Sequence, residues 1–74
     1  MARTKEEALE RIRIMIQIME REGLDDNGIT QSIQRLIEEH GVENAKRIVE
    51  VMGTMFQSDP GKHQIVNNLL REIF

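Results

Sequence analysis

The feature that most constrains the fold is the apolar run at residues 12–19, Ile-Arg-Ile-Met-Ile-Gln-Ile-Met. On a helix with about 100° between residues, one stripe contains Ala8, Leu9, Ile12, Met15, Ile16 and Met19. Ile14 and Ile18 widen this stripe past half of the helix circumference. A helix of this kind must be buried on more than one side. We therefore expect the remaining helices to pack around it.

The same run also fits an extended strand, because every second residue from 12 to 18 is isoleucine. A lone strand would need a partner chain, as in a ribbon-helix-helix DNA-binding dimer, with Arg13, Met15 and Gln17 facing the groove. The helix is favoured because residues 5–11 are strong helix formers, and because Ala8 and Leu9 follow the helical period. The strand remains the structural alternative.

Capping signals divide the chain into four helices, expected at about residues 5–22, 28–40, 43–57 and 60–73. Thr4 opens a capping box, and Gly23 can end the first helix in a left-handed conformation. Gly41 separates the second helix from the third, and Asp59-Pro60 begins the last. The predicted fold is all-α, a compact four-helix bundle-like arrangement in a single helical domain spanning residues 1–74.

A polar turn is expected at residues 24–28, where Asp25, Asp26 and Asn27 suit a helix-capping turn. These residues also suggest a calcium loop. The register is wrong for one, because it places Ile29 and Leu36 where oxygen ligands belong. We expect no metal at this turn.

Composition argues against several classes of function. The chain has no cysteine, which removes thiolate chemistry and leaves the cytoplasm as the default compartment. Its net charge of -3 arises in the first forty residues, and two phenylalanines are its only aromatic residues. A basic face and a base-stacking platform are therefore missing, so nucleic acid is not an expected partner. The longest apolar runs are too short for a signal peptide or a membrane span. We expect a soluble chain without a cofactor.

Candidate catalytic residues have simpler structural interpretations. Ser58, Asp59 and His63 are the residue types of a hydrolase triad, but Ser58 and Asp59 stand where helix caps are expected and no oxyanion turn accompanies them. Neither His40 nor His63 has a second ligand at metal spacing, and both are expected to be structural. Gly53 is expected inside a helix, where it would let a neighbouring helix approach closely. The sequence therefore predicts no enzyme activity.

Binding of DNA and binding of a partner in a methionine-lined groove are two interpretations that the sequence favours less. Residues 28–57 have the tight glycine turn of a helix-turn-helix, but Lys46 and Arg47 are offset by Glu43 and Glu50, so phosphate attraction is weak. Methionines at positions 15, 19, 52 and 55 could line an adaptable groove, although at helical spacing they more often fill a core.

The leading hypothesis is a small stand-alone helical domain with no catalytic or cofactor function, such as an artificial protein assembled from native-like helix pairs. Local signals support it, because caps, glycines and apolar faces agree nearly everywhere along the chain. The alternative is a small protein-protein interaction module. It would use the second face of the first helix, around Ile14, Ile18 and Arg11, to form a homodimer or to bind a partner helix.

Overall fold

The computed structural model describes residues 4–23 and 28–74, and they form three helices with no strand among them. The helices are α1 (Lys5–Glu22), α2 (Ile29–Met55) and α3 (Pro60–Ile73). The all-α prediction is confirmed. Residues 1–3 and the predicted capping turn at 24–27 lie outside the described residues.

The first helix forms where the sequence predicted it. The Thr4 hydroxyl accepts a hydrogen bond of 3.1 Å from the backbone amide of Glu7, and Gly23 ends the helix with a φ of 66°. α1 covers all of residues 12–18, so the strand alternative is wrong. The ribbon-helix-helix hypothesis depended on that strand and is wrong with it.

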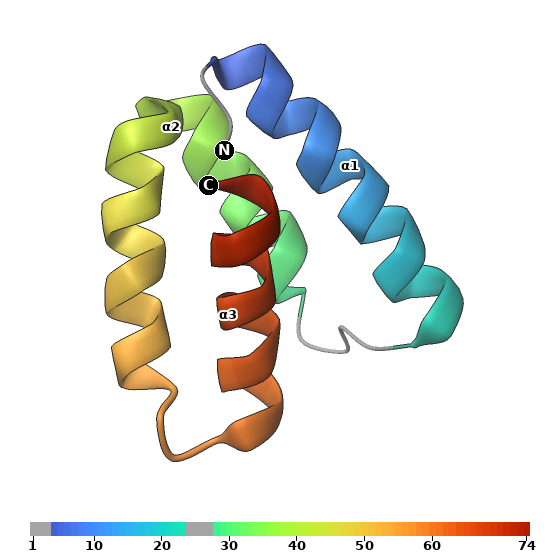
Figure 1. Ribbon diagram of the computed structural model, residues 1–74, viewed down its shortest axis with the longest axis vertical. Coiled ribbons are helices and arrows are strands. Elements are labelled where there is room, and N and C mark those ends of the chain that lie inside the picture. The colour runs from blue at the N-terminus through green and yellow to red at the C-terminus, as the bar shows by residue number, and fades with distance from the viewer. Residues whose placement is uncertain (1–3, 24–27) are drawn as a thin grey trace.

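The predicted count of four helices is also wrong, because the helices expected at 28–40 and 43–57 are parts of one element, α2. Gly41 interrupts it with a φ of 80° and a ψ of 172°, values that favour glycine. The chain reverses direction at this kink: the first part of α2 passes behind α3, and the second part runs beside it (Figure 1). One glycine supplies the whole bend, so no loop is needed to end one helix and begin another.

The last helix also begins at its predicted cap. The Asp59 carboxylate accepts a hydrogen bond of 3.3 Å from the Lys62 amide, and Pro60 occupies the first turn, where it has no donor to lose. Ile73 and Phe74 are both buried.

A single cluster of apolar side chains joins the three helices. Its buried members are Ala8, Ile12, Met19, Ile29, Ile33, Ile37, Ala45, Val49, Ile65, Val66, Leu69, Ile73 and Phe74. α2 packs extensively on both other helices, whereas the contact between α1 and α3 is smaller. α1 therefore lies at one edge of the molecule, as Figure 1 shows, with one side against the core and another side uncovered. No helix in the described part of the chain is both long and apolar enough to cross a membrane.

Candidate interaction surface

The outer face of α1 carries two exposed isoleucines one helical turn apart. Ile14 retains 53% and Ile18 retains 38% of its accessible surface, whereas Ile12 on the opposite side retains none. Each residue advances the helix by about 100°, so Ile14 and Ile18 share a face that points away from Ile12. We call Ile14 and Ile18 the α1 stripe.

A shallow hollow borders the α1 stripe on the side of α3. Its volume is about 430 Å³, and it is lined by Arg11, Ile14 and Met15 from α1 and by Arg71, Glu72 and Ile73 from α3. Met15 is half-buried and Ile73 is buried, so the lining combines apolar side chains that belong to or pack on the core with the charged side chains of two arginines and a glutamate. Apolar groups next to arginine are typical of protein contact surfaces.

Arg11 lies one turn before Ile14 and forms an ion pair with Glu7. Its guanidinium Nη2 lies 3.0 Å from Glu7 Oε1, and the side chain is 35% exposed. The structure therefore brings together the three predicted interaction residues: Ile14 and Arg11 line the same hollow, and Ile18 continues the face by one turn. Arg11 has five N–H donors, so its bond to Glu7 leaves others for a second acceptor.

A second exposed apolar surface lies on the last part of α2. Ile48, Val51 and Met55 are 37%, 59% and 72% exposed. Neither Ile48 nor Val51 was among the predicted interaction residues, and the helical spacing of Met55 favoured a place in the core. We call these three residues the α2 stripe. The signal that could have indicated the α2 stripe is the width of the apolar face of this helix. Around the helix circumference, apolar residues extend from the direction of Val49 to that of Val51, which is wider than one neighbouring helix covers.

The methionines divide between core and surface. Met19 is buried, Met15 and Met52 are half-buried against the core, and Met55 is the most exposed large apolar residue in the described part of the chain. The interpretation of all four as core is therefore wrong for Met55.

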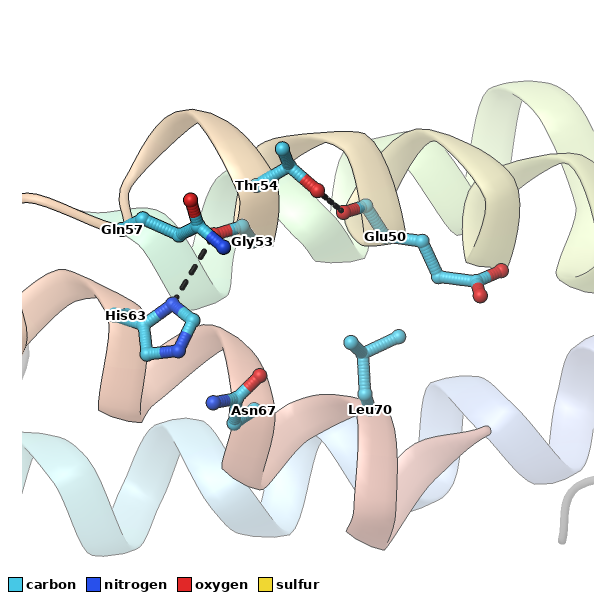
Figure 2. Close-up of a pocket in the computed structure, with 7 residues that line it drawn as sticks. All are labelled: Glu50, Gly53, Thr54, Gln57, His63, Asn67 and Leu70. Atoms are coloured by element: carbon cyan, nitrogen blue, oxygen red, sulfur yellow. Dashed lines mark hydrogen bonds between the residues drawn. The ribbon is translucent and has the colours of Figure 1, made fainter.

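A second hollow, of about 310 Å³, lies between α2 and α3. Figure 2 shows its lining residues: Glu50, Gly53, Thr54, Gln57, His63, Asn67 and Leu70. His63 Nδ1 donates a hydrogen bond of 3.1 Å to the Gly53 carbonyl oxygen, close to the end of α2. This bond ties the first turn of α3 to the last turns of α2 and gives His63 a structural contact.

Gly53 is buried where α2 faces α3. A Cβ atom at this position would lie 3.4 Å from Val66 Cγ1 and 4.0 Å from Asn67 Oδ1. α3 therefore packs next to Gly53, but the approach does not depend on glycine. The remaining space would still accept a methyl group at ordinary contact distance.

The residues considered for catalysis or metal binding have other contacts. Asp59 caps α3, and no hydrogen bond in the described part of the chain joins Ser58 to His63. His40 does not continue the buried face of α2: its side chain is 48% exposed, and its Nε2 lies 3.9 Å from Glu39 Oε2. Among residues 4–23 and 28–74, no group of three or more histidine, aspartate or glutamate side chains is placed to hold a metal ion.

Comparison of the chain with protein families, with curated proteins and with solved structures gave no match.

Proposed function

We propose that this chain is a non-catalytic helical domain that associates with a second copy of itself through the α1 stripe. The observation that carries the proposal is the exposure of Ile14 and Ile18 beside a hollow that is lined by both apolar and charged side chains. Covering an exposed isoleucine removes apolar surface from water, and full burial of such a side chain is worth about 1.5–3 kcal/mol. A second α1 would cover all four isoleucines of the pair.

The non-catalytic part of the proposal is supported by the roles of the polar candidates in folding. Asp59 caps α3 and His63 joins α3 to α2, so each has a structural task at its position. A chain of this size also gains from association, because a core built from about seventy residues leaves a small margin of stability.

Sedimentation equilibrium tests the proposal. Two isoleucines make a contact smaller than the roughly 800 Å² per partner of a standard interface, so we expect a weak dimer with a dissociation constant of about 10 μM or higher. The wild-type chain should change from monomer to dimer between about 10 μM and about 1 mM. The double variant Ile14→Glu, Ile18→Glu should stay monomeric throughout, because four carboxylates would have to be buried in the contact.

The α2 stripe provides a matched control. The double variant Val51→Glu, Met55→Glu introduces the same charges on an apolar surface of similar exposure. We expect it to dimerise like the wild type. Dimerisation lost in this variant and kept in the α1 variant would assign the contact to α2 and overturn the proposal.

The competing hypothesis is a free-standing fold without a partner, whether natural or artificial. It is favoured by the side-chain caps of α1 and α3 and by the buried apolar face of each of the three helices. It predicts a wild-type monomer at every concentration up to about 1 mM, which would contradict self-association through either stripe.

A further inference from the structure

The charges around the α1 stripe are arranged symmetrically about Ile16. Glu10-Arg11 lies one turn before Ile14, and Arg21-Glu22 lies one turn after Ile18. Arginines stand five residues from Ile16 on each side, glutamates stand six, and the isoleucines stand two. Glu10, Arg21 and Glu22 are exposed and form no side-chain hydrogen bond or ion pair within the described part of the chain.

The helical period separates these four charges into two edges. Viewed along the direction midway between Ile14 and Ile18, Arg11 and Glu22 fall on one edge of the stripe, and Glu10 and Arg21 fall on the other. A two-fold axis that relates two antiparallel helices places the same edge of both copies on the same side of the contact. Arg11 of one copy then faces Glu22 of the second copy, and Glu10 faces Arg21.

The heights of these groups along the helix also agree. With Ile16 of both copies at the axis, Arg11 and the second copy's Glu22 differ by one residue, which is about 1.5 Å along the helix. The same difference separates Glu10 from Arg21. Each pair occurs twice, so two isoleucines from each copy would meet between two neutral clusters of two arginines and two glutamates.

From this charge complementarity we infer that the occupant of the α1 stripe is a second copy of the chain, docked antiparallel, with Ile14 against Ile18 and Arg11 against Glu22. The inference rests on the proposed self-association and adds the orientation and the residue pairs that form in it. A parallel pair would also match opposite charges, with Arg11 facing Glu10, so the charges indicate a second copy and the helix dipoles favour the antiparallel arrangement, in which they are opposed. The turns that flank the α2 stripe carry no such set of charges: Asn44 and Ala45 lie one turn before Ile48, and Ser58 and Asp59 lie one turn after Met55.

Charge reversal tests the orientation. In the single variants Arg11→Glu and Glu22→Arg, like charges would face each other twice, so we expect the dissociation constant to rise about tenfold in each. The double variant Arg11→Glu, Glu22→Arg should restore the wild-type dissociation constant, because the pairs form again with reversed signs. In a parallel dimer Arg11 would face Glu10, and Arg21 would face Glu22. The double variant would then keep both repulsions and stay weak, which would overturn the inference.

Matched controls are available on the same helix. Arg13 and Glu20 are exposed on the side of α1 away from the stripe. The variants Arg13→Glu and Glu20→Arg change the net charge by the same amounts and should leave the dissociation constant within about twofold of the wild type. Circular dichroism of each variant at low micromolar concentration verifies that the monomer folds.

The outcomes distinguish the inference from the proposal on which it rests. One outcome is that Ile14→Glu with Ile18→Glu abolishes the dimer, while the double variant Arg11→Glu, Glu22→Arg dimerises as weakly as the single charge variants. This outcome would overturn the antiparallel arrangement alone. A wild-type chain that remains monomeric would overturn both.

Discussion

Ile12 and Ile14 are two residues apart on α1 and have identical side chains, yet their surroundings are opposite. Ile12 is fully buried in the cluster shared by all three helices, whereas Ile14 retains 53% of its surface. The run of four isoleucines therefore does two different things. One side holds α1 to the molecule, and the other side offers an apolar surface to solvent or to a second helix. A dense apolar run indicates that a helix needs cover, but not how much of that cover its own chain provides.

The largest difference between the two sides is expected from truncation of Ile12. Ile12→Ala removes a fully buried side chain from between helices and leaves a cavity, so we expect a loss of about 2–5 kcal/mol in the free energy of unfolding. Urea denaturation followed by circular dichroism measures it. A loss below about 0.5 kcal/mol would show that α1 is not held by this side.

An intermediate effect is expected for Ile16, which lies on the side of α1 opposite the α1 stripe, at the edge of the face that packs on the core. Its side chain is half-buried and packs against the core without being part of its fully buried set. Ile16→Ala should therefore lower the free energy of unfolding by about 1–2 kcal/mol, less than the full cavity cost. The same denaturation experiment gives the value. A cost equal to that of Ile12→Ala would contradict the difference in burial.

The smallest effect on folding is expected for Ile14. Ile14→Ala should change the free energy of unfolding by no more than about 0.5 kcal/mol in dilute solution, because the side chain has few contacts to lose and alanine is the better helix former. At high concentration the same variant should dimerise less than the wild type. A large loss of stability in the dilute monomer would place Ile14 in the core and would contradict the difference in burial between Ile12 and Ile14.

Most of the fold could be predicted from local signals. The start and end of α1 and the start of α3 follow from Thr4, Gly23, Asp59 and Pro60. Each of these residues affects only the helical turn next to it, through a capping hydrogen bond or its backbone conformation. The number of helices could not be predicted in the same way. A glycine such as Gly41 is expected both at the end of a helix and at a kink within one. Whether two helices or one kinked helix results depends on whether helical residues follow the glycine directly, as they do here.

The candidate surface was only partly predictable for a related reason. The helical period shows that Ile14 and Ile18 lie on a different side of α1 from Ile12, and the sequence of α1 is enough to show it. The width of the apolar arc on α2 indicates that one neighbouring helix cannot cover all of it. Which part stays exposed depends on where α3 packs against α2, and this position leaves Ile48 and Met55 uncovered. The hollow beside Arg11 likewise exists only because the end of α3 lies next to α1.

In the proposed dimer, the outer side of α1 is covered by α1 of a second copy of the chain. Isotope-filtered NMR of a mixture of ¹³C-labelled and unlabelled chains at about 1 mM, where a weak dimer is populated, measures this contact directly. We expect intermolecular NOEs between the methyl groups of Ile14 in one chain and Ile18 in the other. A spectrum without intermolecular NOEs, or with NOEs only from Val51 and Met55, would contradict the proposed dimer.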